Sequence, residues 1–334
     1  MKKLINNPEN VVEEMIEGYV KAHPSHIKRL PENDRSLVTA RETREGKVGV
    51  LIGGGSGHEP AFMGYVGEGM ADGVAVGNIF SSPPPDPILE ATKAIDKGAG
   101  VVYLYGNYAG DVMNFGMAAD MADMEEDIRV ESALTTDDVA SAPKEEMDKR
   151  RGIAGELFVF KTTGAAAAKG YDLDDVVRVA KKTNSHTRSM GVAISPCSMP
   201  QTGQPSFVLE ENEMEIGLGH HGEPGVERSE IQPADQVADR LLNDILTDMP
   251  LNKGDRVAVL VNGLGSTPRM ELYIMFRKVE QALAEKGISI YRSYVGDYIT
   301  SMEMGGCSIT LMKLDDELAE MVDYPADCPM FVQR

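Results

Sequence analysis

The fold is decided by residues 48–60, which read VGVLIGGGSGHEP. The first five residues are apolar and mostly β-branched, and they predict a short strand at residues 48–52 that is buried on both faces. The run of glycines that follows predicts a loop over residues 53–60. Small ligands bind at the carboxyl ends of the strands of parallel sheets, so this loop lies where a binding site is expected.

Strands and helices alternate around this segment in the first half of the chain. A helix is predicted to begin at Asn7-Pro8, with proline at its first position. A second helix runs from Pro83 to Lys97 and ends at Gly98, and a second buried strand covers Val101 to Tyr105. Further helical patterns lie at about 112–124, 153–168 and 173–183. Such alternation is typical of an α/β domain with a mostly parallel sheet.

The pattern changes near residue 184. The predicted strands lie at 190–194, 206–209, 214–218, 256–261 and 289–294, and the predicted helices at about 234–247 and 269–285. We therefore predict two α/β domains, residues 1–184 and 185–334, with a boundary near 183–188. Each is expected to hold a mostly parallel or mixed sheet flanked by helices, and the first carries the glycine-rich loop.

The charged stretch KEEMDKRR, at residues 144–151, lies inside the first predicted domain. It contains no Gly or Ser and mixes both signs of charge, which is unlike a flexible linker. The stretch therefore predicts a solvated surface segment.

Composition excludes several classes of protein. The 334 residues are 42% hydrophobic and 26% charged, as in ordinary globular chains. A net charge of −20 repels a phosphate backbone, so no nucleic-acid partner is expected. Apolar runs reach only about five residues, against about 20 for a membrane span, and no signal peptide is visible. The three scattered cysteines indicate neither disulfides nor a zinc site. A soluble, reduced, cytoplasmic protein is expected.

The loop at residues 53–60 matches none of the common glycine-rich motifs. No Lys-Ser/Thr follows it, as a Walker A loop requires, and Pro60 breaks a GxGxxG pattern. His58 stands where the last glycine of a GxSxG elbow belongs. A tight strand–helix turn is one reading of the loop. The titratable side chain of His58 favours a functional site.

A second candidate follows the strand that ends at Tyr105, in the motif NYAGD at residues 107–111. A carboxylate at the carboxyl end of a strand is well placed to take a proton from a hydroxyl group. Asp111 fits that role, and it fits equally well as the N-cap of the next helix.

Two further motifs contain glycine-flanked polar residues. In GLGHHGEPG, residues 217–225, the adjacent His220 and His221 point apart if the chain is extended, so a metal site shared with His58 is disfavoured. A surface loop is as good a reading, but a histidine here is mostly neutral at pH 7 and can act as a base or nucleophile. NGLGSTP, at residues 262–268, is a weak phosphate-loop candidate, and a structural turn is the better reading.

The motifs resemble, in order and spacing, those of one family: GGGSGHEP (53–60), NYAGD (107–111), HGEPG (221–225) and NGLG (262–265). This family is the substrate-binding subunit of dihydroxyacetone kinases, and the resemblance covers essentially the whole chain. It implies a two-domain α/β subunit that forms a homodimer and takes part in phosphorylating a short ketose.

The resemblance also implies roles for individual residues. His221 holds the substrate carbonyl as a covalent hemiaminal, and a polyol without a carbonyl, such as glycerol, is thereby excluded. His58 acts in acid–base chemistry on the reacting hydroxyl. Asp111 hydrogen-bonds that hydroxyl and shares the role of base. The backbone around Gly54 and Gly55 lines the substrate.

One position departs from the family pattern. Members that act on dihydroxyacetone usually have a lysine directly before the asparagine of the second motif, where this chain has Gly106. The loss of a cation and the gain of space favour a longer substrate, so a C4 ketose (a tetrulose such as erythrulose) is expected to fit better.

The phosphoryl donor is expected on another chain. ATP-dependent single-chain members of the family carry an additional helical nucleotide-binding domain, for which a chain ending at Arg334 leaves no room. We therefore expect this chain to bind no cofactor and no metal. The donor, either ATP with Mg²⁺ or a phosphorylated carrier protein, would reach the ketose through a separate nucleotide-binding subunit.

Two alternatives differ in class. The first is a non-catalytic regulator that binds a ketone and a transcription factor, but such a sensor needs His221 and not the base, Asp111. The second is a dehydrogenase, which the broken GxGxxG pattern disfavours.

Overall fold

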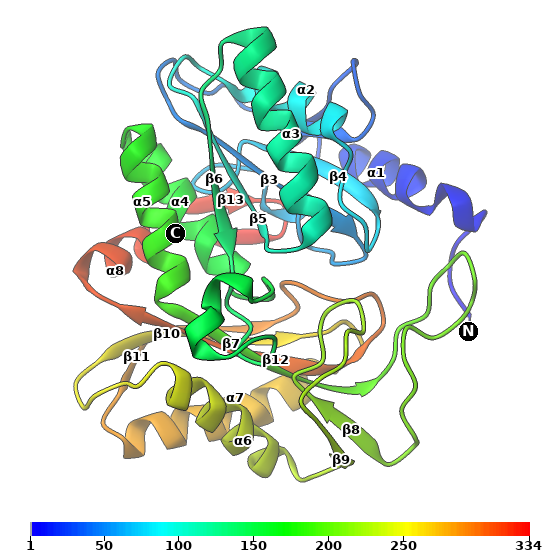
Figure 1. Cartoon of the computed structure of the whole chain (residues 1–334), viewed down its shortest axis with the longest axis vertical. Helices are drawn as coiled ribbons and strands as arrows, with labels where there is room; N and C mark the ends of the chain where they lie inside the picture. The colour runs from blue at the N-terminus through cyan, green and yellow to red at the C-terminus, as the bar shows by residue number, and fades with distance from the viewer. Residues whose placement is uncertain (1) are drawn as a thin grey trace. The chain divides into compact units, whose positions relative to one another are not determined.

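The strand predicted at residues 48–52 is β3 (Gly49–Ser56) in the computed structural model, which describes residues 2–334 (Figure 1). It lies inside a six-stranded sheet of order β1-β2-β4-β3-β5-β6, in which β3, β4, β5 and β6 run parallel. The other strands are β1 (Ile27–Arg29), β2 (Ser36–Thr39), β4 (Gly73–Ile79), β5 (Val101–Gly106) and β6 (Val130–Thr135). A parallel centre of this kind confirms the predicted fold class.

The prediction of a loop starting at Gly53 was wrong, because β3 continues through Ser56. Gly53 and Gly54 pair with Ala75 and Val76 of β4. A Cβ at Gly53 would lie 2.6 Å from the carbonyl oxygen of Ala75, so glycine lets the two strands approach where a side chain could not.

Two helices, α2 (Pro85–Ile95) and α3 (Ala109–Glu126), lie side by side over this sheet (Figure 1). They bury an apolar core in which the rings of Tyr105 and Phe115 stack at 4.4 Å. Each such side chain contributes about 1.5–3 kcal/mol on burial. Four further helices are α1 (Val11–Ala22), α4 (Glu156–Lys169), α5 (Leu173–Ser185) and α8 (Asp316–Asp323).

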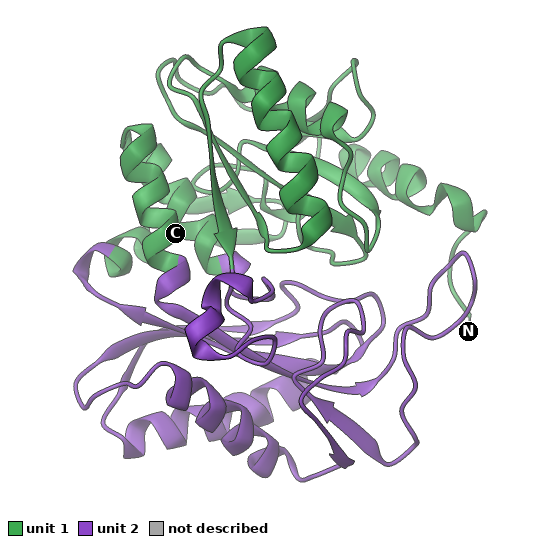
Figure 2. Ribbon diagram, in the orientation of Figure 1, with its two compact units in different colours: residues 1–135, 158–183, 318–334 green, residues 136–157, 184–317 purple. Residues whose placement is uncertain are grey.

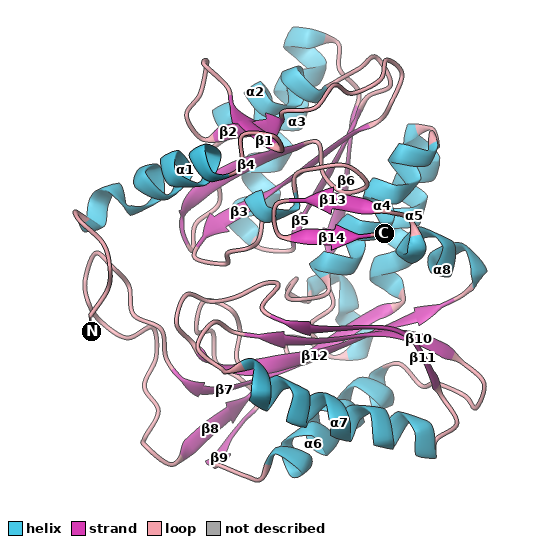
Figure 3. Cartoon of the chain, turned by 180° about the vertical axis from the view of Figure 1, so that it is seen from behind, coloured by secondary structure: helices cyan, strands magenta, loops and turns pink. Residues whose placement is uncertain are grey.

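A second six-stranded sheet has the order β11-β10-β12-β7-β8-β9, and in it only β10 and β11 run parallel. Its strands are β7 (Thr187–Ser195), β8 (Glu213–Ile216), β9 (Glu227–Glu230), β10 (Arg256–Gly263), β11 (Ser289–Gly296) and β12 (Gly305–Leu314). The helices α6 (Ala234–Asp248) and α7 (Arg269–Glu285) pack together against one face of this sheet (Figure 3). The strand predicted at 206–209 was wrong, since Val208 is exposed and that segment pairs with no strand.

By its contacts the chain forms two units (Figure 2). Unit 1 comprises residues 1–135, 158–183 and 318–334, including the hairpin of β13 (Ala326–Cys328) and β14 (Phe331–Gln333). Unit 2 comprises residues 136–157 and 184–317. Residues 136–157 thus group with the second sheet, and residues 318–334 group with the first sheet.

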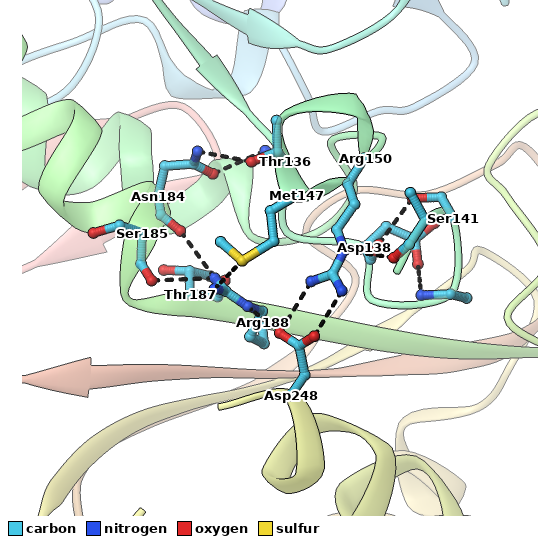
Figure 4. A network of polar contacts seen from close by, with 12 residues as sticks. Thr136, Asp138, Ser141, Met147, Arg150, Asn184, Ser185, Thr187, Arg188 and Asp248 are labelled. Atoms are coloured by element: carbon cyan, nitrogen blue, oxygen red, sulfur yellow. Dashed lines mark hydrogen bonds and ion pairs between the residues drawn. The ribbon is translucent and has the colours of Figure 1, made fainter. Parts of the chain in front are cut away.

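The charged stretch at residues 144–151 is only partly the solvated segment that was predicted. Residues Lys144–Lys149 form an exposed 3-10 helix, but the side chain of Arg150 is 1% exposed. Figure 4 shows the reason: Arg150 and Arg188 converge on the carboxylate of Asp248, at the end of α6. Although burial alone raises the pKa of Asp248, the two guanidinium groups lower it below its usual range. The ion cluster ties this stretch to unit 2.

Other expectations concern cysteines and membranes. Cys197, Cys307 and Cys328 are all buried thiols. Burial raises the pKa of the Cys307 and Cys328 thiols to about 12, so neither sulfur is a nucleophile at neutral pH. None of the helices between residues 2 and 334 combines the length and the hydropathy that a bilayer crossing requires.

Candidate active site

Two of the motifs lie at one edge of the sheet in unit 1. β3 and β5 are parallel neighbours, so residues 57–60, which follow β3, and the NYAGD motif after β5 leave the sheet at the same edge. Ligands bind at this edge in α/β folds.

His58 follows β3 and is held in place by packing. Its ring is 5% exposed and stacks on the ring of Phe80 at 5.0 Å. The next residue, Glu59, turns back so that both of its carboxylate oxygens accept from the backbone N–H of Gly57, at 3.1 Å each. Burial raises the pKa of Glu59. This local turn fixes the backbone on both sides of the imidazole.

The glycines before His58 serve close packing. A Cβ at Gly54 would lie 2.5 Å from the ring of Phe62, and one at Gly55 would lie 2.7 Å from the backbone nitrogen of Ser81. Both positions therefore exclude any side chain, and the backbone itself forms this surface. Gly106, at the end of β5, is buried as well.

Asp111 lies in the first turn of α3 and is 9% exposed. The helix begins one turn earlier than predicted and its N-cap is Tyr108, so the reading of Asp111 as an N-cap was wrong. A carboxylate in the first turn is stabilised by the positive end of the helix dipole. Asp111 also lies near Tyr105 of β5, whose pKa is raised by burial and by the charge of Asp111.

His221 lies in unit 2, in the loop between β8 and β9, and its side chain is a quarter exposed. Its Nδ1 lies 2.9 Å from Oε1 of Glu223, and its backbone N–H donates to Oε2 of the same carboxylate at 3.0 Å. Gly222, at φ +90°, makes the turn that brings the two side chains together. His220, its neighbour, is buried.

The contact with Glu223 determines what His221 can do. Burial alone raises the pKa of Glu223. The hydrogen bond and the charge of His221, together with a backbone hydrogen bond and the charge of Arg151, outweigh burial and hold the pKa at about 2. A carboxylate on Nδ1 retains the proton there, and the lone pair of Nε2 is then available to attack an electrophile. A histidine that a carboxylate orients in this way can serve as a nucleophile.

Sequence reasoning did not assign a role to Glu223. The signal was present, because a carboxylate two residues after a histidine with glycine between them can fold back onto the ring. Arg151, which lies 3.8 Å from Glu223 through Nη1 and Oε2, comes from a distant segment and leaves no such signal.

The motif at residues 262–268 has a structural role, as its preferred reading predicted. Asn262 is fully buried, and its Oδ1 accepts from the backbone N–H groups of Tyr298 and Ile299, both at 2.9 Å. Its Nδ2 donates to the carbonyl of Ile299 at 2.7 Å. The asparagine thus fastens the segment after β11 to the end of β10.

The predicted site residues are therefore divided between the units. Gly54, Gly55, His58, Gly106 and Asp111 lie at one sheet edge of unit 1, and His221 lies in unit 2. Among residues 2–334 no group of three or more His, Cys, Asp or Glu side chains is arranged to hold a metal ion.

Comparison with known proteins gives consistent matches. The family model described as the Dak1 domain matches residues 17–330. The chain is 50% identical over 331 residues to a dihydroxyacetone-binding subunit of a PTS-dependent dihydroxyacetone kinase of Listeria innocua, and covers 99% of each chain. It is 44% identical to a D-erythrulose kinase of Mycolicibacterium smegmatis, covering 99% of this chain and 56% of that one.

Solved structures agree. A dihydroxyacetone kinase operon co-activator superposes with a TM-score of 0.89 at 33% identity, covering 96% of this chain and 98% of that one. These matches confirm the resemblance that the four motifs carry, and they cover both units. The chain belongs to the Dak1 family.

Proposed function

We propose that this chain is the ketose-binding subunit of a hydroxyketone kinase. It captures a short ketose and presents a terminal hydroxyl to a phosphoryl donor carried by another subunit. The observation that carries the proposal is the His221–Glu223 pair inside a chain that is 50% identical, end to end, to a dihydroxyacetone-binding subunit.

Capture begins at Nε2 of His221. Its lone pair forms a bond to the carbonyl carbon, the π electrons of the C=O bond move to oxygen, and that oxygen takes a proton from water. The ring of the resulting hemiaminal carries a positive charge, and its Nδ1–H still donates to Oε1 of Glu223. The ionised carboxylate therefore stabilises the adduct more than it stabilises the free imidazole.

The hydroxyl to be phosphorylated is handled by the residues of unit 1. Asp111 accepts its hydrogen bond, and His58 and Asp111 together remove its proton as the bond to phosphorus forms. Backbone around Gly54 and Gly55, where no side chain fits, lines the ketose. Because transfer passes through a loose transition state, positioning and charge neutralisation provide most of the catalysis.

The first prediction concerns the donor. Relatives of the same length are named as subunits of PTS-dependent kinases, while the D-erythrulose kinase is almost twice as long. We expect the chain with ATP and Mg²⁺ alone to bind ketose without phosphorylating it. Adding a helical nucleotide-binding subunit, or the phosphorylated carrier that serves it, should produce turnover. A coupled assay at high protein concentration checks both arms.

Two features of that assay matter. Because the net charge of this chain is −20, association with the partner should depend on salt. Robust ATP-dependent turnover by the chain alone would contradict the proposal that another subunit carries the phosphoryl donor.

The similarity to an operon co-activator supports a second function, a regulator that binds ketose without phosphorylating it. Ketose binding with no turnover in the presence of either donor system would favour that function.

A second prediction concerns substrate length. Gly106 occupies the position where a lysine is usual, and the similarity to a D-erythrulose kinase supports a larger substrate. We expect kcat/KM to be higher for a C4 ketose than for dihydroxyacetone. The difference should correspond to about 1–3 kcal/mol of transition-state binding. Gly106→Lys should shift the preference toward dihydroxyacetone. A wild-type preference for dihydroxyacetone over every tetrulose would show that Gly106 does not set substrate length.

A further inference from the structure

A buried ion pair supports the carboxylate of Glu223 from outside the HGEPG motif. Arg151 donates from Nε to Oδ2 of Asp138 at 3.0 Å, and its Nη2 lies 2.8 Å from the same oxygen. The Asp138 side chain is 2% exposed and that of Arg151 is 14% exposed. The remaining Nη1 faces Glu223 Oε2 at 3.8 Å. The guanidinium therefore joins two carboxylates of unit 2.

Arg151 is also anchored through groups other than its carboxylate partners. Its backbone N–H donates to Oγ of Ser141 at 3.0 Å, and its Nη2 reaches the carbonyl oxygen of Gly217 at 3.3 Å. Asp138 in turn accepts from the backbone N–H of Ala140 at 3.0 Å. The side chain of Arg151 thereby links segment 136–157 to the loop before His221.

Gly219 shows how closely these groups are packed. A Cβ at this position would lie 2.2 Å from Oε2 of Glu223 and 2.4 Å from Nη1 of Arg151. Any side chain would push the carboxylate or the guanidinium aside. The absence of one at residue 219 leaves the space that both groups need to approach each other.

We propose that Arg151, fixed by Asp138, is a positioning residue for ketose capture, which rests on the proposed function. It holds Oε2 of Glu223, so that Oε1 stays on Nδ1 of His221 and Nε2 keeps its lone pair toward the ketose. Without it the Glu223 side chain gains rotational freedom and solvent competes for the oxygen that faced the guanidinium. The effect is on the adduct and not on the later transfer of phosphate.

The test compares Arg151→Gln, Arg151→Lys and Asp138→Asn with Arg228→Gln as a matched control. Arg228 braces the other end of the same loop, because it pairs with Glu215, whose carboxylate accepts from the backbone N–H of Gly225 at 2.7 Å. It has no hydrogen bond or ion pair to Glu223 among the contacts described. A general loosening of the loop would lower adduct formation to a similar extent in Arg151→Gln and Arg228→Gln.

We expect Arg151→Gln to raise the KM for ketose, and to lower the fraction of covalent adduct by intact mass, about tenfold. The kcat with the partner subunit should stay within about twofold. Arg151→Lys should recover part of the loss, because lysine keeps the charge without the two-pronged geometry. Asp138→Asn should behave like Arg151→Gln, and Arg228→Gln like the wild type.

A double-mutant cycle separates positioning from general structural damage. In a Glu223→Gln background, Arg151→Gln should add little further loss, because the group it positions is gone. Two outcomes would overturn the positioning role if the wild type still forms the adduct. One is an equal loss of adduct in Arg151→Gln and Arg228→Gln. The other is full additivity of the losses caused by Arg151→Gln and Glu223→Gln. Absence of adduct in the wild type would instead overturn the proposed function itself.

Discussion

Replacing His221 with alanine should abolish covalent retention of ketose. Wild-type protein mixed with dihydroxyacetone or a tetrulose and rapidly desalted should carry the mass of one ketose, whereas His221→Ala should carry none. Nε2 is the only nucleophile that the proposal gives to the carbonyl carbon. Because holding two reactants in place is worth many orders of magnitude in effective concentration, kcat/KM should fall about 10³-fold or more.

The control for this experiment is a histidine outside the site. His186, directly before β7, hydrogen-bonds Ser185 through its ring. The His186→Ala variant should retain ketose like the wild type. Unchanged retention in His221→Ala, with an unaltered melting temperature, would remove His221 from the mechanism.

The second large effect is expected from the residues of unit 1. His58→Asn and Asp111→Asn should each still form the adduct, since neither side chain takes part in carbonyl attack. Turnover with the partner subunit should fall by about 10² to 10⁴, the usual contribution of a general base. The adduct is measured by intact mass and the turnover by a coupled kinase assay.

These two variants distinguish chemistry from binding. Because His58 packs on Phe80 and Asp111 is buried in the first turn of α3, each variant is compared with the wild type by thermal unfolding before kinetics. Turnover within about tenfold of wild type in both would exclude them as the proton acceptor. Loss of the adduct would mean that they shape the ketose site instead of serving as bases.

Much of the fold was predictable because its signals are local. The apolar run at 48–52 identified a strand, and the helical pattern predicted from Pro83 to Lys97 corresponds to α2, which spans Pro85–Ile95. The glycines were misread as a loop because a flexible residue and a residue that permits close strand contact look identical in sequence. Only the pairing of Gly53 with Ala75 separates the two.

Long-range contacts were beyond sequence reasoning. Arg150 looks like any charged surface residue, and its burial depends on Asp248, 98 residues later. Residues 318–334 follow β12 of unit 2 in the chain yet belong to unit 1. For the site, the HGEPG motif made His221 a candidate, but the arginine that faces Glu223 comes from a separate segment.

The central claim is that a ketose becomes bonded to His221, and nuclear magnetic resonance tests it most directly. Ketose labelled with ¹³C at the carbonyl carbon is added to protein labelled with ¹⁵N in histidine. We predict that the labelled carbon moves from the carbonyl to the tetrahedral region and couples to one histidine nitrogen, and that both changes vanish in His221→Ala. A carbonyl signal that stays unshifted at saturating protein would contradict the account.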